Sequence, residues 1–356
     1  MSGGHHGRVG VLGAGAWGTA LAQMLASDGR EVLIWARERE LVDEINSARS
    51  NSIYLPTATL ADTIRATGDL VEMAKLDALL VVTPAQHMGS VLAAMPAHPH
   101  DLVLCSKGIE AGSGRLMNHV AKDVATGSAI AVLSGPTFAH EVAAGLPTAV
   151  TLACDGGEKQ WNRISAMIAR PTFRPYYSDD IIGAEIGGSV KNVLAIACGV
   201  VDGLGLGQNA RAALIARGYA EMLRFGEALG ARAETLAGLC GLGDLVLTCS
   251  STSSRNFSLG KALGEGKSAD TLMADRRTVA EGAHTAPVLV ELAEQRGVAM
   301  PIVEAVHSLL TGGAPREVVS DLLSRPLRAE QGPAGGQRKN RTKTSPPWRK
   351  VGGRIS

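Results

Sequence analysis

The 356-residue chain is long enough for two domains, because a single hydrophobic core seldom grows beyond about 250–300 residues. Hydrophobic residues make up 45% and charged residues 19% of the chain, which is the composition of an ordinary globular protein. Aromatic residues make up only 3%, which argues against base-stacking surfaces and so against nucleic acid as a partner. No uninterrupted apolar run reaches the roughly 18 residues of a membrane span, and the N-terminus lacks the apolar region of a secretory signal. We therefore expect a cytoplasmic protein without stable membrane insertion.

Short β-like runs alternate with helical patterns over the first half of the chain. The predicted strands are residues 8–12, 31–35, 78–82, 102–106, 129–133, 148–153 and 173–177. Helical stretches lie between most of them. Strands and helices that alternate at this length indicate a mostly parallel sheet covered by helices on both faces. The sequence therefore predicts a doubly wound α/β domain over residues 7–178.

A glycine-rich turn follows the first predicted strand and opens the first predicted helix. It reads Gly13-Ala14-Gly15-Ala16-Trp17-Gly18, the GxGxxG pattern of dinucleotide-binding sites. Gly13 permits the tight turn, Gly15 lets the backbone approach a pyrophosphate, and Gly18 allows close packing of helix on strand. The N-terminus of the helix then offers free N–H groups to the anion. The pattern alone could be a coincidental turn, but this context predicts a Rossmann-type fold that binds a nicotinamide dinucleotide.

The end of the second predicted strand bears on the choice of cofactor. An acid there accepts hydrogen bonds from the ribose 2′-hydroxyl of NAD, whereas an arginine can hold the 2′-phosphate of NADP. Arg37 stands at this position, so we expect NADPH to be favoured over NADH. Arg37 could instead pair with a surface acid, and the neighbouring Glu38 leaves room for NADH.

The pattern changes at Ser178-Asp179-Asp180, a cluster typical of helix N-caps. The stretches 182–201, 211–229, 233–239 and 285–296 have helical character without alternating strands, which predicts an all-α C-terminal domain over residues 179–327. Residues 331–356 carry seven basic side chains and no acid, and residues 328–356 hold little to bury. We therefore predict a disordered basic tail, which could alternatively contact an anionic membrane or nucleic acid.

Five cysteines are present, and neither their number nor their spacing indicates a disulfide set or a metal site. Each stands among small or apolar neighbours, as buried free thiols do. We predict structural roles for all five, namely Cys105, Cys154, Cys198, Cys240 and Cys249. No metal site is expected anywhere in the chain.

Several further motifs occur in a specific order along the chain. They are SKGIE at residues 106–110, SGPTFA at 134–139, VKNV at 190–193, GLGDL at 241–245, SRN at 254–256 and EG at 281–282. Together with the glycine turn, they resemble the bacterial NAD(P)-dependent glycerol-3-phosphate dehydrogenases from about Val9 to about Ile302. The resemblance implies reversible reduction of dihydroxyacetone phosphate to sn-glycerol 3-phosphate, a role in glycerophospholipid synthesis, and a homodimer. Trp17 departs from the family, in which tyrosine or phenylalanine is common, and the tail has no counterpart.

Lys191 stands in the middle of an apolar helical stretch, where burial would lower the pKa of its ammonium group toward neutrality. Such a lysine can protonate the alkoxide that forms when a hydride reaches a ketone, or remove that proton in the reverse direction. It could instead be a snorkelling lysine whose ammonium lies in water. The resemblance favours the catalytic role. It also implies that Asp244 binds the substrate hydroxyls and orients Lys191, although an acid in this turn could simply cap a helix.

The resemblance assigns the remaining contacts with substrate and cofactor. The phosphate would lie at Arg255 and Asn256, since a guanidinium and an amide can satisfy several oxygens at once. Lys107 follows a predicted strand and would contact the substrate at the carboxyl edge of the sheet. The other residues implied for the substrate are Gly135, Thr137, Asn192, Thr248 and Ser254. Those implied for the cofactor, besides the three glycines and Arg37, are Ala16, Trp17, Lys107, Ala139, Arg255, Val279 and Glu281.

Two other functions fit parts of this pattern. A dehydrogenase of another hydroxy acid or sugar acid would share the two-domain plan, but the Ser254-Arg255-Asn256 segment argues for a phosphorylated substrate. A non-catalytic dinucleotide sensor could use the basic tail for interaction, but Lys107, Lys191 and Asp244 together argue for an enzyme.

Overall fold

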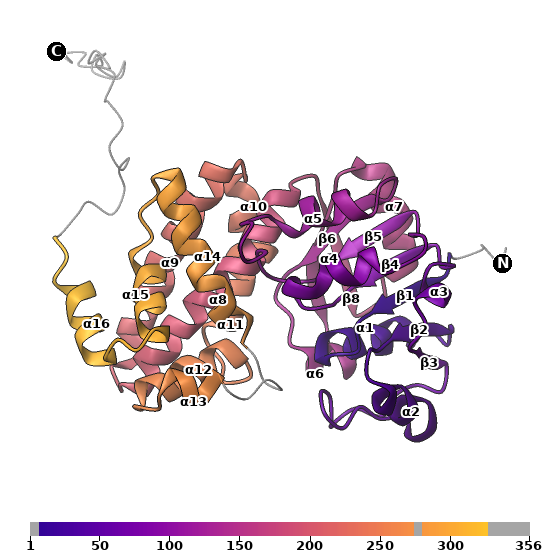
Figure 1. Cartoon of the computed structure of the whole chain (residues 1–356), viewed down its shortest axis with the longest axis horizontal. Helices are drawn as coiled ribbons and strands as arrows, with labels where there is room; N and C mark the ends of the chain where they lie inside the picture. Colours follow the sequence, from indigo (N-terminus) through magenta and orange to yellow (C-terminus); the bar gives the residue numbers. More distant parts are fainter. Residues whose placement is uncertain (1–6, 274–279, 327–356) are drawn as a thin grey trace, which may run out of the picture.

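A computed structural model describes residues 7–273 and 280–326 of the chain. Its first half contains an eight-stranded sheet with the order β3-β2-β1-β4-β5-β6-β7-β8 (Figure 1). The strands are β1 Val9–Leu12, β2 Val32–Trp35, β3 Ile64–Thr67, β4 Ala78–Val81, β5 Asp101–Leu104, β6 Ala129–Ser134, β7 Thr148–Cys154 and β8 Phe173–Ser178. All neighbouring strands are parallel except β6 and β7, which are antiparallel. The predicted doubly wound, mostly parallel sheet is confirmed.

Helices cover both faces of this sheet, so most strand residues are buried on either side. These helices are α1 Ala16–Ala26, α2 Arg39–Ala48, α3 Leu70–Met73, α4 Ala85–Ala93, α5 Met117–Val124, α6 Ala139–Ala143 and α7 Gly157–Ile168. In β5, Val103 belongs to the core on one face, whereas Leu102 and Leu104 belong to the core on the other. This alternation follows from the two-residue period of a strand and explains why the strand is uniformly apolar.

One strand, β3, was not predicted from the sequence. It pairs with β2 at the edge of the sheet, with Ile64 opposite Val32, and Arg65 points to solvent. Its four residues, Ile-Arg-Ala-Thr, contain a single large apolar side chain, which is too little for a periodicity signal. The strand forms because its neighbour offers a free edge, which is a property of the folded sheet.

The second half is helical. It consists of α8 Ile181–Gly203, α9 Gly207–Leu229, α10 Ala233–Ala237, the π-helical turn η1 Leu239–Gly243, α11 Asp244–Thr248, α12 Arg255–Gly264, α13 Ala269–Met273, α14 Glu281–Arg296, α15 Pro301–Leu310 and α16 Pro315–Leu323. The Asp180 side chain accepts a 2.8 Å hydrogen bond from the Gly183 N–H, so the predicted N-cap at this position is confirmed. The all-helical second half is confirmed too. The predicted tail, 328–356, lies outside the described residues.

Helix α8 is the central element of the helical half (Figure 1). By length and composition alone, this helix could cross a membrane. However, 94% of its most apolar 18-residue segment is buried inside the molecule, as in the core helix of a globular domain. Two glycines bring it against α12: a Cβ on Gly199 would lie 2.0 Å from the Phe257 carbonyl oxygen, and one on Gly260 would lie 1.9 Å from the Ile196 carbonyl oxygen. The two backbones therefore touch, which a larger side chain would prevent.

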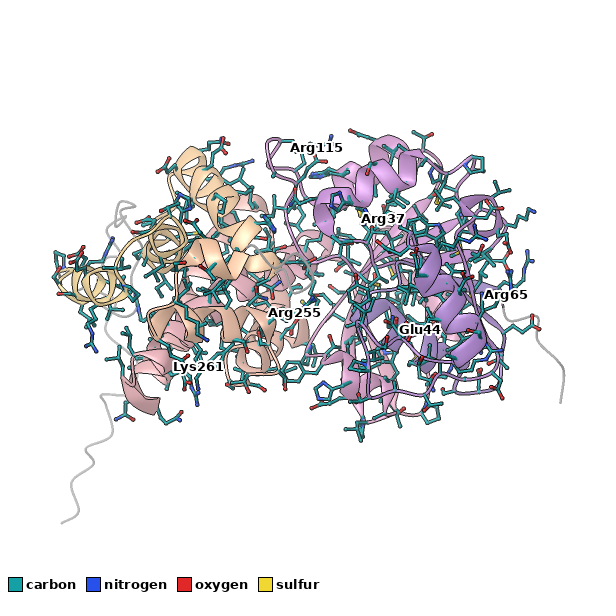
Figure 2. The ribbon with its side chains drawn as sticks, turned by 60° about the horizontal axis from the view of Figure 1, so that its bottom comes forward. Arg37, Glu44, Arg65, Arg115, Arg255 and Lys261 are labelled. Atoms are coloured by element: carbon teal, nitrogen blue, oxygen red, sulfur yellow. The ribbon has the colours of Figure 1, made fainter. Side chains whose placement is uncertain are left out.

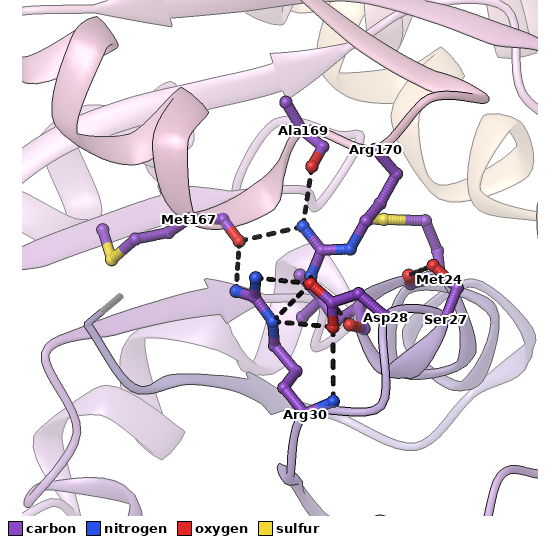
Figure 3. Close-up of polar contacts among 8 residues, drawn as sticks. Met24, Ser27, Asp28, Arg30, Met167, Ala169 and Arg170 are labelled. Carbon is purple, nitrogen blue, oxygen red and sulfur yellow. Dashed lines mark hydrogen bonds and ion pairs between the residues drawn. The ribbon is translucent and has the colours of Figure 1, made fainter. Parts of the chain in front are cut away.

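Helix α1, which follows the glycine turn, is held to α7 by a cluster of charged side chains (Figure 3). The buried Arg170 guanidinium donates to the Leu25 and Met167 carbonyl oxygens near the ends of α1 and α7, at 2.7 and 3.2 Å. Arg30 donates to the same Met167 oxygen, and Asp28 pairs with Arg30 at 2.6 Å. Cations at helix C-termini satisfy carbonyls that lack partners within the helix. This cluster fixes the C-terminal end of α1.

The cysteine prediction is also confirmed. All five side chains are buried and free in the structure. Burial raises the pKa of the Cys240 thiol to about 11, which leaves it protonated and unreactive at neutral pH.

Candidate functional site

The glycine turn has the geometry that a dinucleotide needs. Gly13 has a φ of 123°, a backbone conformation that favours glycine. A Cβ on Gly13 would lie 3.0 Å from the Val82 backbone, so a larger residue would not fit there. A Cβ on Gly18 would lie 1.8 Å from the Gly13 oxygen, so helix and strand pack as closely as predicted. The Cβ position of Gly15 has open space around it. No side chain in the described residues caps the N-terminus of α1, so its N–H groups are free for a pyrophosphate.

Trp17, in the first turn of α1, adds a second indication that a ligand binds here. Its side chain is half-buried, and its indole Nε1 is buried without a hydrogen-bond partner among the described residues. Buried polar atoms rarely lack partners in native proteins. The residues present therefore fit a nicotinamide dinucleotide, whose pyrophosphate would be held by this turn.

Arg37 lies just beyond the end of β2, where the sequence placed it. Its side chain is 75% exposed, and its guanidinium donates to the Glu38 carboxylate at 2.7 Å. Of the two alternatives considered for Arg37, the pair with a surface acid is present in the structure, and the predicted contact with a 2′-phosphate stays a prediction. A pair this exposed is worth only about 0–1 kcal/mol, so a 2′-phosphate could displace Glu38 at little cost.

Two lysines and one aspartate meet where the two halves of the chain join. Lys191 on α8 donates to Asp244 Oδ1 at 2.5 Å and to Thr248 Oγ1 at 3.0 Å. Lys107, which follows β5, donates to Asp244 Oδ2 at 2.9 Å and to the Gly135 carbonyl oxygen at 3.4 Å. Asp244 is the first residue of α11, and its carboxylate binds both lysines instead of capping the helix.

Lys191 is 4% exposed, so the alternative of a lysine that snorkels into water is wrong. Burial lowers the pKa of the Lys191 ammonium group to about 7; the Asp244 carboxylate opposes this shift and the Lys107 charge adds to it. Burial also disfavours the charge on Lys107, but attraction and hydrogen bonding by Asp244 outweigh it and raise the Lys107 pKa. One lysine is thus poised to exchange a proton near neutral pH while the other stays charged.

The predicted phosphate residues open helix α12. The Ser254 hydroxyl is its N-cap and accepts from the Phe257 N–H at 3.2 Å, so this segment is a helix N-terminus and not a loop. Asn256 is buried, donates to Asn192 Oδ1 at 3.0 Å and accepts from the Gly282 N–H at 2.9 Å. Arg255 is exposed (Figure 2).

These bonds tie the start of α12 to α8 and α14. Since Asn192 follows Lys191, the residues predicted to bind the phosphate are linked by hydrogen bonds to the same helix that carries Lys191. Glu281, at the start of α14, lies near Arg255, Lys107 and Lys191. Burial raises the pKa of the Glu281 carboxyl group, and the three positive charges partly oppose this rise.

Most other predicted residues lie near this centre. Gly135 and Thr137 line a narrow pocket with Trp17 and Lys107, and the Thr137 hydroxyl donates to the Gly135 carbonyl oxygen at 3.3 Å. Ala16 and Ala139 are the first residues of α1 and α6, two helices in contact with each other. Val279 lies outside the described residues.

Sequence reasoning missed two polar groups around this site. Ser134, the last residue of β6, is 4% exposed, and its hydroxyl has no partner among the described residues. It opens the SGPTFA motif that was used for the resemblance, so its place in that motif was an available signal. Thr83, which follows β4, also has a buried hydroxyl without a partner in that part of the chain, and no sequence signal marked it.

Comparison with known proteins gives one family. A model of the NAD-dependent glycerol-3-phosphate dehydrogenase N-terminus matches residues 8–160, and a model of the C-terminus matches residues 180–320. A protein of Erythrobacter litoralis named glycerol-3-phosphate dehydrogenase [NAD(P)+] is 73% identical over 322 residues, which is 90% of this chain and 97% of the relative. A protein of Novosphingobium aromaticivorans with the same name is 74% identical over 323 residues, 90% of this chain and 98% of the relative.

A solved structure supports the same grouping. The crystal structure of glycerol-3-phosphate dehydrogenase from Coxiella burnetii has a TM-score of 0.85 and 40% sequence identity, and covers 90% of this chain and 99% of that one. Both halves of the chain are thus matched by one family. The chain belongs to the NAD-dependent glycerol-3-phosphate dehydrogenase family.

Proposed function

We propose that this chain catalyses the reversible NAD(P)H-dependent reduction of dihydroxyacetone phosphate to sn-glycerol 3-phosphate. The observation that carries the proposal is the buried Lys191–Asp244–Lys107 cluster beside the dinucleotide turn. The relatives' name, glycerol-3-phosphate dehydrogenase [NAD(P)+], supports the substrate and the cofactor. In a cell, the product would feed glycerophospholipid synthesis.

The bound dinucleotide supplies the hydride that reduces the C2 ketone. Lys191 then donates a proton from Nζ to the oxygen at C2, and takes it back in the reverse direction. Its pKa of about 7 makes both protonation states accessible at neutral pH, which is the condition for efficient acid–base catalysis. Asp244 fixes the position of Nζ through its 2.5 Å hydrogen bond.

Lys107 supplies a lasting positive charge next to the reacting oxygen. Asp244 raises its pKa, so the charge persists where negative charge develops during the reaction. Arg255, at the exposed start of α12, is suited to hold the substrate phosphate in a bidentate manner. Asn256 has one amide hydrogen left for the same phosphate after its bond to Asn192.

The residues proposed to bind the dinucleotide are those of the glycine turn, Arg37, Ala139 and Glu281. We further propose that Arg37 favours NADPH over NADH. The protein would act as a cytoplasmic homodimer. Light scattering during size-exclusion chromatography tests the last point, and a mass of one chain at micromolar concentration would contradict it.

The test of the proposed activity is the loss of NADPH absorbance on addition of dihydroxyacetone phosphate. We expect turnover with this substrate and little with unphosphorylated dihydroxyacetone, because Arg255 would then have no phosphate to bind. Lys191→Ala should lower kcat by about 10²–10⁴-fold, the usual contribution of a general acid. Lys122→Ala, which removes a half-exposed lysine on α5, is the matched control. Absence of turnover in the unmodified protein would refute the assignment.

A further inference from the structure

The glycine turn contacts an asparagine that lies outside the motif. Asn51, which follows α2 in the chain, is completely buried. Its amide Nδ2 donates to the Ala14 carbonyl oxygen at 2.9 Å and to the Thr19 hydroxyl at 2.8 Å. Ala14 stands between the first two glycines of the turn, 37 positions before Asn51. A side chain that is distant in the sequence therefore reaches the loop that is proposed to hold the pyrophosphate.

The Ala14 carbonyl group depends on side chains for its hydrogen bonds. Before it, the Gly13 N–H donates to the carbonyl oxygen of the last residue of β2 at 3.1 Å; after it, the Gly15 carbonyl oxygen accepts from the Thr19 N–H at 2.9 Å. Within residues 7–273 and 280–326, no backbone N–H donates to the Ala14 carbonyl oxygen. Asn51 and, at 3.3 Å, the Thr19 hydroxyl are its donors there. Because Ala14 is buried, loss of these donors would leave its carbonyl group unpaired.

The direction of this carbonyl group determines where the next N–H points. The peptide bond between Ala14 and Gly15 is trans, and the C=O and N–H of a planar trans peptide point in opposite directions. Because the Ala14 carbonyl group points to the buried Asn51, the Gly15 N–H points away from it. A Cβ built on Gly15 would meet no atom within 4 Å, so a ligand has room beside this residue.

The two glycines make this contact important. Gly13 and Gly15 flank the Ala14 carbonyl group, and glycine has more accessible backbone conformations than any other residue. If the peptide unit between Ala14 and Gly15 rotated, a carbonyl oxygen would replace an N–H on the side that faces the ligand. An oxygen there would repel a pyrophosphate, whereas an N–H attracts it. The bond from Asn51 opposes this rotation.

Asn51 is itself fixed by its neighbours. Its Oδ1 accepts from the Tyr54 N–H at 3.0 Å, so the amide cannot turn over without losing this bond. On α2, the Glu44 carboxylate accepts from the Ser50 hydroxyl at 2.8 Å and from the Ser52 N–H at 2.7 Å. These bonds hold the residues on both sides of Asn51. The donor is therefore in position before any ligand binds.

We propose that Asn51 is a positioning residue for the dinucleotide: by holding the Ala14 carbonyl oxygen, it directs the Gly15 N–H toward the pyrophosphate. This inference rests on the proposed function in that the ligand is a nicotinamide dinucleotide. Because the peptide is fixed in the free protein, binding does not have to order it, and less affinity is lost.

Isothermal titration with two ligands tests this role without turnover. NADP⁺ contains the pyrophosphate, whereas adenosine 2′-monophosphate has the adenosine and the 2′-phosphate but no pyrophosphate. Asn51→Leu approximately preserves the size of the side chain and removes the donor, so NADP⁺ should bind at least about fivefold more weakly, the effect of one lost hydrogen bond. The Kd of adenosine 2′-monophosphate should change less than about twofold. A residue that only stabilised the domain would affect both ligands.

Two further variants support this comparison. Thr19→Val exchanges the hydroxyl for a methyl group and leaves the 2.9 Å bond from Asn51 in place, so it should weaken NADP⁺ binding selectively by only about two- to fivefold. Asn46→Leu is the matched control. The Asn46 amide also bonds to backbone, donating to the Ala66 carbonyl oxygen at 3.0 Å and accepting from its N–H at 2.8 Å, but these bonds lie at β3. It should alter neither Kd.

The outcomes separate this proposal from the proposed reaction. Equal weakening of both ligands in Asn51→Leu, or unchanged NADP⁺ binding, would overturn the role of Asn51. If Asn51→Leu does not fold, a selective loss of NADP⁺ affinity in Thr19→Val supports the proposal, and any other result in that variant overturns it. If these Kd differences are found but the unmodified protein does not reduce dihydroxyacetone phosphate, the proposed reaction alone is refuted. Absence of NADP⁺ binding to the unmodified protein would refute both.

Discussion

Helix α8 carries a buried lysine, Lys191, and a buried glutamate, Glu185, and the two have different hydrogen-bond partners. Lys191 has a carboxylate and a hydroxyl within hydrogen-bonding distance, so its charged form is partly stabilised. Glu185 has one backbone N–H, from Asn118 at 2.7 Å, and burial raises its pKa to about 8. Burial therefore moves the pKa of each group toward neutrality from opposite sides, and the local partners set how far it moves.

The first prediction concerns the pH dependence of the two directions of the reaction. Reduction needs protonated Lys191, so its kcat/KM should fall as pH rises through about 7; oxidation needs the neutral amine and should rise over the same interval. Steady-state rates across pH measure both. Asp244→Asn removes the charge that supports the ammonium, so the inflection should move to lower pH. Parallel profiles for the two directions would contradict the role of Lys191.

The second prediction concerns cofactor choice at Arg37. Arg37→Ala should raise the KM for NADPH by about tenfold or more and leave the KM for NADH nearly unchanged, because only NADPH offers a phosphate to the guanidinium. Glu38→Gln should act in the opposite direction, since it frees Arg37 from its 2.7 Å partner. Steady-state titration of each cofactor at saturating substrate gives both constants. Equal changes for NADPH and NADH would refute the assignment.

At the scale of elements, the site depends on how closely α8 and α12 pack. α8 carries Lys191 and Asn192, and α12 begins with Arg255 and Asn256. The Asn192–Asn256 hydrogen bond at 3.0 Å links the two sets. Close contact of the backbones at Gly199 fixes the distance between Lys191 and the proposed phosphate residues.

The third prediction tests this packing. Gly199→Ala would place a methyl group 2.0 Å from the Phe257 oxygen, so the helices must separate. We expect a loss of about 1–3 kcal/mol in the free energy of unfolding, together with a higher KM for dihydroxyacetone phosphate. Urea unfolding and steady-state kinetics measure the two effects. Ser320→Ala, on an exposed position of α16, is the control and should change neither.

At the scale of the whole molecule, Glu185 helps to join the two halves. It extends from α8 to the Asn118 N–H at the start of α5, which belongs to the sheet half. Glu185 Oε2 and Asn118 Oδ1 are both buried acceptors without partners in the described chain. A proton on Glu185 lowers the cost of burying its carboxyl group, which agrees with the raised pKa.

The fourth prediction follows from the sign of this shift. The pKa of Glu185 is higher in the folded state than its ordinary value of 4.5, so the folded state holds the proton more tightly. The stability that this provides is fully present below pH 4.5 and is lost as pH rises toward about 8. The glutamine in Glu185→Gln cannot ionise. The free energy of unfolding of this variant, relative to that of the unmodified protein, should therefore rise by a few kcal/mol across that pH interval.

Urea unfolding near both ends of this pH interval measures the effect. Glu158→Gln, in the first turn of α7 and exposed, serves as the control. A constant difference between the Glu185 variant and the unmodified protein at all pH values would contradict the prediction.

Local patterns were sufficient for much of this molecule. The sequence by itself determined the glycine turn, because GxGxxG between a strand and a helix requires only short-range geometry. It also determined the sheet strands with long apolar runs, the cap at Asp180 and the central position of Lys191 in an apolar helix. Each of these depends on residues a few positions apart, where periodicity and backbone preferences act directly.

Other features arise only in the folded chain. β3 forms on a free sheet edge, and helices α12, α15 and α16 were not predicted. α12 packs closely along α8, a contact that only the folded chain provides. From the sequence, Asp244 could also have capped a helix. Its carboxylate binds Lys107 and Lys191 because folding brings these two lysines to it from distant elements. Likewise, Ser134 is buried beside Gly188 of α8, a neighbour that is distant in the sequence. The sequence indicated that the Lys191 pKa would fall, but pairing depends on which distant segments meet. Tertiary structure therefore decided that both lysines share Asp244 and that the Lys107 pKa rises.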